Sequence, residues 1–267
     1  MPDFLIYLIT ALLYAGVAFN QWHQNREERF LLSERVALAA GLVFHGWLLV
    51  TDLFNSGGVN FGLSNAVSLI LWLTVLIYWV ASLRHDLHAM QAFVLPPAAL
   101  AVMMQKLLPS EHILPYTGDA LFGAHLVIAL LAYSLFTFAA LHAGLMTMAE
   151  RSLHNKKPMM RLPEFPPIMP MERLLFQMIG VGFVLLTLTV VSGIFFSEEI
   201  FHQALRFNHK TVFSIASWLI FAALLLGRRI WGWRGRVAVR WTLTGFVLLI
   251  LAYVGTKFVL EVILGRY

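Results

Sequence analysis

Eight apolar runs, separated by short polar connections, dominate the sequence. We place them near residues 4–20, 36–52, 63–82, 90–108, 120–148, 174–197, 211–227 and 241–263. A helix that crosses the hydrocarbon of a bilayer needs about 20 mostly apolar residues. Backbone polar groups must be satisfied within the protein at that depth. Runs of this length therefore predict an all-α, polytopic membrane protein with about eight transmembrane helices.

The composition agrees with this fold class and argues against others. Hydrophobic residues make up 60% of the 267 residues and charged residues only 12%, whereas soluble domains have about 45–50% and about 25%. There is no cysteine, which excludes disulfides, thiolate metal sites and attachment of a cofactor through cysteine. The sequence also lacks Gly-rich phosphate loops, HExxH and GxSxG. We therefore expect no enzymatic activity.

The positive residues predict the orientation of the chain. Most of the 19 Lys and Arg residues lie in the connections after the first, third, fifth and seventh runs. By the positive-inside rule these connections face the cytoplasm, so both termini are expected outside. The basic side chains then contact anionic lipid headgroups, and we expect no nucleic-acid partner.

The longest connection, 149–173, is expected to lie in the cytoplasm and not to be helical. Proline lacks a backbone donor and fixes φ, and this stretch contains Pro158, Pro163, Pro166, Pro167 and Pro170. No long soluble segment stands out elsewhere, so residues 1–267 are expected to form a single integral membrane domain. Any functional site must then lie within the bilayer or at its outer rim.

Three histidines are candidates for that site. His45 lies near the middle of the second run, His125 near the outer end of the fifth, and His209 just before the seventh. Ionisable residues within a membrane are costly and are functional candidates by default. Neutral imidazole ligates metals, and two imidazoles from facing helices can hold one haem. The alternative for each is a histidine that is hydrogen-bonded within the bundle.

The pairing of these histidines depends on how the helices pack. If the fifth and seventh helices are neighbours, His125 and His209 lie at similar depth and can ligate one metal centre. Trp218 and Tyr133 lie on the same two predicted helices and can either pack in the bundle or line a flat apolar cofactor. Their spacing does not decide between the two.

Several stretches carry a family resemblance. They are Asn-His-Lys-Thr-Val-Phe-Ser-Ile-Ala-Ser-Trp at 208–218, Gly-Trp-Arg-Gly-Arg at 232–236, Ala-His-Leu-Val-Ile at 124–128, and His45 with Asn-Ala-Val-Ser-Leu at 65–69. These stretches resemble the CcsA/CcmC cytochrome c assembly superfamily, and the resemblance covers nearly the whole chain. It is strongest to the YpjD-type inner-membrane proteins of Gram-negative bacteria, with HemX-type proteins as relatives. The resemblance implies a multi-pass protein of the bacterial inner membrane.

The resemblance also implies haem as cofactor, with clear departures from the family pattern. Members carry haem to the outer face on a tryptophan-rich segment flanked by histidine ligands. The connection 198–210 stands in its place without tryptophan, and Asn208, His209 and Lys210 replace the family's Asp-Pro-Lys. Two family histidines, expected near Leu226 and Gly265, are missing.

Two family ligands have counterparts in this chain. His125 matches the family's outer ligand, and His45 matches its buried N-terminal histidine. His209 is a candidate to replace a lost ligand beside His125. The candidate haem site therefore comprises His125, His209, His45, Trp218, Tyr133 and Lys210, with His125 and His209 as iron ligands.

Two functions fit best. The first is a haem-binding or haem-handling inner-membrane protein related to cytochrome c assembly factors. The second is a non-catalytic membrane subunit with a degenerate haem pocket, which regulates haem synthesis or a neighbouring transporter. A small-solute transporter fits less well because paired buried acids are missing. The expected partners are haem, the bilayer and other membrane proteins of haem or cytochrome c pathways.

Overall fold

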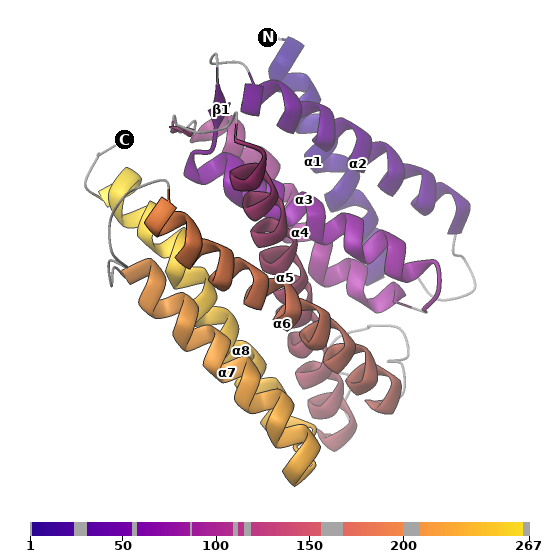
Figure 1. Cartoon of the computed structure of the whole chain (residues 1–267). Coiled ribbons are helices and arrows are strands. Elements are labelled where there is room, and N and C mark those ends of the chain that lie inside the picture. The colour runs from indigo at the N-terminus through magenta and orange to yellow at the C-terminus, as the bar shows by residue number, and fades with distance from the viewer. Residues whose placement is uncertain are drawn as a thin grey trace.

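The computed structural model describes residues 2–23, 31–54, 58–85, 87–108, 112–114, 119–155, 168–199 and 209–263. In these ranges the chain is almost wholly helical, which confirms the predicted fold class (Figure 1). The helices are α1 (Pro2–His23), α2 (Leu31–Phe54), α3 (Leu63–Ser82), α4 (His88–Leu107), α5 (Ala120–Asn155), α6 (Ile168–Glu199), α7 (His209–Trp231) and α8 (Arg236–Ile250). Two π-helical segments, η2 (Leu251–Gly255) and η3 (Phe258–Ile263), continue α8. Two short strands, β1 (Val59–Asn60) and β2 (Ile113–Leu114), pair antiparallel.

Seven helices in the described ranges are long and apolar enough to cross a membrane. The helix outside this set is α4, which covers most of the predicted fourth run and contains Pro96, Pro97, Gln91 and Gln105. It packs against α1 and α3, and both glutamine side chains are buried. The protein, rather than lipid, therefore surrounds the polar residues that lower its hydropathy.

Helices α5 and α6 both extend into the predicted connection 149–173, so the expectation that this stretch is not helical is wrong for residues 149–155 and 168–173. Helix α5 continues to Asn155 and α6 begins at Ile168. Pro170 lies in the first turn of α6, where a proline nitrogen needs no hydrogen-bond partner within the helix. The other prolines of this connection lie outside the described residues. Its cytoplasmic location stays a prediction.

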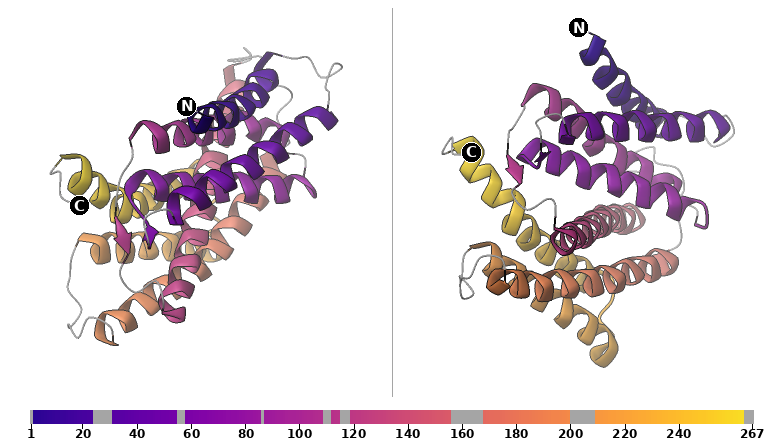
Figure 2. Two further views of the ribbon diagram at one scale, coloured as in Figure 1. Left: turned by 90° about the horizontal axis from the view of Figure 1, so that it is seen from above. Right: turned by 45° about the horizontal axis from the view of Figure 1, so that its top comes forward.

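The eight helices form two groups of four. Helices α1 and α3 each pack on both α2 and α4, which closes the first group, and α5–α8 close the second in the same way. Helix α5 also contacts α3 and α4, and it lies between the two groups in the right-hand view of Figure 2. The long connection divides the sequence into five runs and three. In space, however, α5 belongs with the last three helices.

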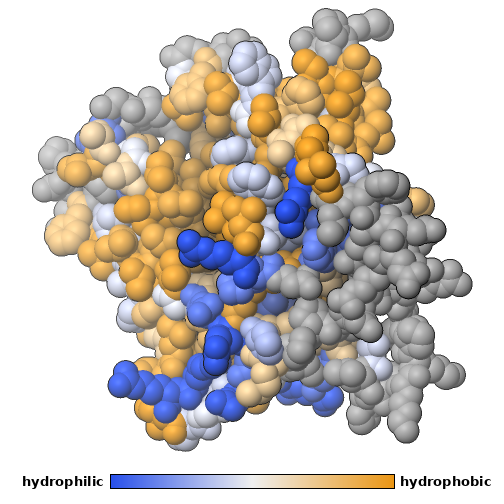
Figure 3. All heavy atoms as spheres, turned by 90° about the vertical axis from the view of Figure 1, so that its right-hand side faces the viewer, coloured by the Kyte–Doolittle hydropathy of each residue, from blue (hydrophilic) through white to orange (hydrophobic). Residues whose placement is uncertain are grey.

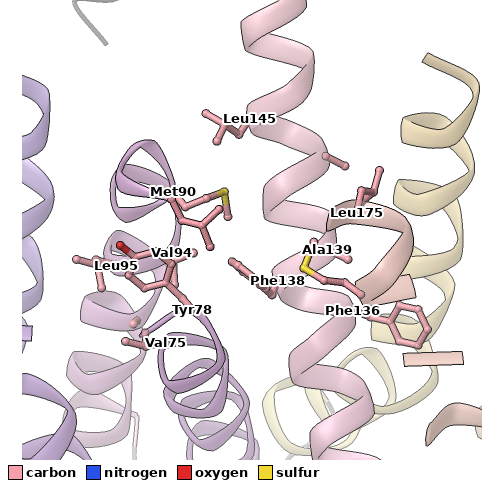
Figure 4. Close-up of a cluster of buried hydrophobic side chains, with 14 of the residues drawn as sticks. Val75, Tyr78, Met90, Val94, Leu95, Phe136, Phe138, Ala139, Leu145 and Leu175 are labelled. Carbon is pink, nitrogen blue, oxygen red and sulfur yellow. The ribbon is translucent and has the colours of Figure 1, made fainter. Parts of the chain in front are cut away.

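Buried aromatic side chains join the two groups. Tyr78 of α3 meets Phe138 of α5 edge to face, with ring centroids 6.4 Å apart, beside Met90 of α4 (Figure 4). On the other side of α5, Phe136 stacks on Phe221 of α7 at 3.9 Å. Helix association in a bilayer depends on van der Waals packing rather than on the exclusion of water. Close aromatic contacts of this kind therefore hold α5 at the centre.

The two ends of the bundle differ. The strand end holds β1 and β2, the start of α1 and the end of η3, and the basic end holds the connections 83–87 and 232–235 (Figure 1). At the basic end Arg236 pairs with Glu150 at 2.8 Å. On the face seen in Figure 3, hydrophobic side chains predominate in the upper part and hydrophilic ones gather in the lower part.

Glu172 of α6 anchors the turn between α7 and α8 at the basic end. Its nearly buried carboxylate accepts a hydrogen bond from Arg228 at 3.4 Å and another from the backbone N–H of Gly235 at 3.3 Å. Gly235 has a φ of 53°, a left-handed conformation that glycine adopts at little cost. Trp233 stacks on Trp231 and meets Trp241 at a tilt, at 5.6 and 4.9 Å between ring centroids.

Candidate functional site

His125 lies near the start of α5, at the strand end, and faces α6. Its Nδ1 is 2.7 Å from the Oγ of Ser192. The hydroxyl of Ser192 is also within hydrogen-bond distance of two backbone carbonyl oxygens, that of Leu188 at 2.6 Å and that of Thr189 at 3.2 Å. With the hydroxyl hydrogen assigned to either carbonyl, Nδ1 donates to Ser192 and carries the proton of the neutral ring. The lone pair of the imidazole is then on Nε2, through which histidines bind metals.

The backbone of α6 also limits the position of the His125 ring. A Cβ built on Gly193 would lie 3.6 Å from Cε1 of the ring, which is ordinary van der Waals contact. Ser192 thus holds the imidazole by a hydrogen bond, and the neighbouring Gly193 presents its side-chain-free backbone toward the ring. Metal-ligating histidines ordinarily donate their other ring N–H to such a partner, which fixes the tautomer and orients the ring.

His209 and Lys210 form the start of α7, also at the strand end, and both are exposed. Helices α5 and α7 contact each other through the Phe136–Phe221 stack and share α6 and α8 as neighbours. Helices α6 and α8 lie between α5 and α7 in the second group, so the two helices touch at this stack without packing along their length. The pair itself stays a prediction.

Asn208, which the family resemblance aligns with the Asp-Pro-Lys motif, lies outside the described residues. Among the residues that the structure describes, no group of three or more His, Cys, Asp or Glu side chains can hold a metal ion. A haem needs no such group, since its porphyrin supplies four ligands and the protein supplies one or two.

Trp218 and Tyr133 are oriented by different neighbours. The indole Nε1–H of Trp218 donates to Oγ1 of Thr187 at 2.9 Å, and its ring stacks on Phe183 of α6 at 5.5 Å. Tyr133 meets Tyr253 edge to face at 6.2 Å. The contacts of Trp218 favour packing between α6 and α7 over the lining of a cofactor.

His45 lies at the centre of the first helix group and is fully buried. Its Nε2 is 2.8 Å from the Oγ of Ser68, and this hydroxyl donates to Oε1 of Gln105 at 2.5 Å. Nε2 must therefore donate to Ser68, while Nδ1 faces the hydroxyl of Tyr14 at 3.4 Å. Both ring nitrogens have a polar neighbour, which favours a hydrogen-bonded histidine over a ligand.

A polar network continues from Gln105 to the strand end. The Gln105 amide donates to Oδ2 of Asp52 at 3.2 Å and to Oδ1 of Asn65 at 3.3 Å. The hydroxyl of Tyr7 donates to the same carboxylate oxygen at 2.6 Å, and the Asn65 amide donates to the carbonyl of Asn60 in β1 at 3.1 Å. The network ties all four helices of the first group to the strand pair.

Our reading of the sequence missed this network. A signal was present, because Asn65 and Ser68 lie one turn apart on an otherwise apolar helix, and such residues form interhelical hydrogen bonds in membranes. The sequence does not show that Gln105 faces them across α3 and α4. Without the neighbours from α3 and α4, His45 looks like an isolated polar residue in an apolar helix, and the sequence therefore favours a ligand role for it.

The comparisons with known proteins identify the family. The protein-family model described as cytochrome C assembly protein matches residues 35–264, which is most of the chain. The chain belongs to this family. Inner membrane protein YpjD of Escherichia coli K12 is 32% identical over 234 residues, which cover 85% of this chain and 86% of YpjD. Cytochrome c biogenesis protein CcsA of Prochlorococcus marinus MIT 9301 is 25% identical over 183 residues, covering 60% of this chain and 58% of CcsA.

These matches confirm the resemblance seen in the sequence. Together with the seven apolar helices, they identify a multi-pass protein of the bacterial inner membrane. No solved structure matches. Helix α1 precedes the residues that match the family, yet it supplies Tyr7 and Tyr14 to the network around His45.

Proposed function

We propose that this cytochrome c assembly family member binds haem at the strand end, with His125 as the residue that would hold its iron. The observation that carries the proposal is the hydrogen bond between His125 and Ser192, which supports a neutral ring with its proton on Nδ1 and its lone pair on Nε2. The proposal is also supported by the family, since the related CcsA proteins are named for cytochrome c biogenesis.

The residues of the chain would bind and orient the group. His125 supplies the first ligand from α5, and His209 supplies the second from the start of α7. Lys210 offers a positive charge for the haem carboxylates, and Tyr133 contributes to the apolar wall. Bound haem supplies the iron and porphyrin chemistry. The protein binds and presents the haem and catalyses no covalent step of its own.

The proposed orientation places the strand end at the outer face, with both termini outside. It rests on the basic residues at the opposite end of the bundle. Because the chain has no cysteine, single cysteines can report the orientation. In intact spheroplasts, a membrane-impermeant maleimide should label the Lys210→Cys variant and not the Arg234→Cys variant. The reverse pattern would contradict the orientation.

Absorption spectra of the purified protein titrated with haem test the ligands. The wild type should give a Soret band and visible bands typical of two histidine ligands. His125→Ala should lose the band or shift it, and His209→Ala should give the spectrum of a single-ligand haem. The control is His85→Ala, which changes an exposed histidine at the basic end. A normal Soret band in the His125→Ala, His209→Ala double variant would refute the proposal.

A second function is favoured by two observations. Trp218 and His45 are tied to neighbouring helices by hydrogen bonds, and the tryptophan-rich segment of the family is missing from 198–210. We propose as the alternative a non-catalytic membrane subunit that regulates haem synthesis or a neighbouring transporter. It predicts that the purified protein binds no haem.

A further inference from the structure

A small cavity lies at the basic end, remote from His125. It is enclosed by the start of α2, the end of α3 and the start of α4 and measures about 20 Å³, room for one water-sized particle. Its lining includes Glu34, Leu38, Tyr78, Ser82 and Gln91. Neither the polar network around His45 nor the proposed haem site uses these residues.

Glu34 presents an unpartnered carboxylate oxygen at this cavity. Glu34 is only 6% exposed. Oε1 accepts a hydrogen bond from the Asn20 amide of α1 at 2.7 Å, but Oε2 has no hydrogen-bond partner in the part of the chain that the structure describes. No ion pair of Glu34 is found there either. A buried carboxylate without a counter-charge is strongly unfavourable.

Gln91 supplies a second unpartnered oxygen from α4. It is 5% exposed, and its Oε1 likewise has no hydrogen-bond partner among the described residues. The nearby Ser82 hydroxyl donates to the carbonyl of Trp79 at 2.7 Å, so its oxygen offers lone pairs to the cavity rather than a proton. Buried acceptors are nearly always satisfied in native proteins. These oxygens therefore call for a donor or a cation.

We propose that this cavity binds one monovalent cation of about the size of water, with K⁺ and ammonium as the matching ions. The site offers one negative charge, which a single positive charge neutralises. Ca²⁺ or Mg²⁺ would bring a second positive charge, and the lining holds only one carboxylate, that of Glu34, to neutralise it. The cation joins Glu34 of α2 to Gln91 of α4 and, through Asn20, to α1.

The positive groups near the cavity do not replace this cation. Arg35, His85 and His88 also line it; Arg35 and His85 are exposed to solvent, and His88 is half-buried. None of the three forms an ion pair with Glu34 in the described part of the chain. The charges of Arg35 and His85 lie toward the rim, whereas the unpartnered oxygens belong to nearly buried residues.

Thermal unfolding of the purified full chain at constant ionic strength tests the proposal. Chloride salts of K⁺, ammonium, Na⁺ and N-methylglucamine are compared, the last being too large for the cavity. We expect a saturable rise in Tm of several degrees with K⁺ or ammonium over N-methylglucamine. Glu34→Gln and Gln91→Leu should each abolish the rise. Glu150→Gln, which removes an exposed carboxylate at the same end, should keep it.

Two results would overturn the proposal. One is a wild-type Tm that is the same in all four salts, which would mean that the cavity holds only water. The other is a full K⁺ response in Glu34→Gln or Gln91→Leu. If Glu34→Gln does not fold, Gln91→Leu and thallium binding decide the question. Tl⁺, a K⁺ substitute, should give an anomalous scattering peak between Glu34 and Gln91, and its absence there would contradict the site.

Discussion

Replacing Ser192 by alanine isolates the interaction on which the haem proposal rests. Ser192→Ala removes the acceptor of the His125 Nδ1–H bond, 2.7 Å long, and leaves the ligand itself in place. Loss of such an outer partner typically lowers metal affinity about 10–100-fold. That range corresponds to about 1.4–2.7 kcal/mol. The imidazole would also be free to take the other tautomer, with its proton on Nε2.

Haem titration of purified variants in one detergent measures this effect. Ser217→Ala is the control, because it removes a serine hydrogen bond of similar length, 2.8 Å to the Gly245 carbonyl, between α7 and α8. Ser192→Thr keeps a hydroxyl and should restore most of the affinity. An affinity for haem within twofold of wild type in Ser192→Ala would refute the reasoning. Equal losses in the serine control would show a general effect of packing.

Three further predictions concern stability and are measured by thermal unfolding in detergent. Gln105→Leu removes the acceptor of the Ser68 hydroxyl and the amide that donates to Asn65 and Asp52. Ser68 and Asn65 are buried, whereas Asp52 is half-buried and keeps its hydrogen bond from Tyr7. Each orphaned buried group costs about 1–3 kcal/mol, and an unchanged Tm would contradict the network. Gly227→Ala should lower the Tm markedly, since its Cβ would overlap the Trp233 ring. Glu172→Gln should destabilise more than Glu150→Gln, because exposed ion pairs contribute only about 0–1 kcal/mol; equal effects would refute the anchor role.

The helices could be predicted from the sequence because each span is a local feature. The predicted runs fall almost entirely within the observed helical segments. Eight runs were predicted, and α4 is the one whose hydropathy is too low for a membrane-crossing helix. Burial between α1 and α3 lets α4 keep Gln91 and Gln105. The grouping of α5 with α6–α8 could not be predicted, because the long connection suggests a break that packing does not follow.

The candidate site was predictable in part. His125 stands out as an ionisable residue in an apolar helix, and its contact with Ser192 lies 67 residues away, beyond any local pattern. His45 stands out for the same reason, but its partners Tyr14 and Ser68 come from two other helices. Spacing along one chain does not reveal such neighbours. The two histidines therefore look alike in sequence and differ in their surroundings.

The haem content of the purified protein tests the central claim most directly. The protein is overproduced in a bacterial host with haem supplied, purified in mild detergent and assayed by the pyridine haemochrome method, with His125→Ala purified in parallel. Our account predicts nearly one haem per chain for the wild type and a large loss for the variant. Wild-type protein that is folded yet carries no haem, or a variant that carries as much as the wild type, would contradict it.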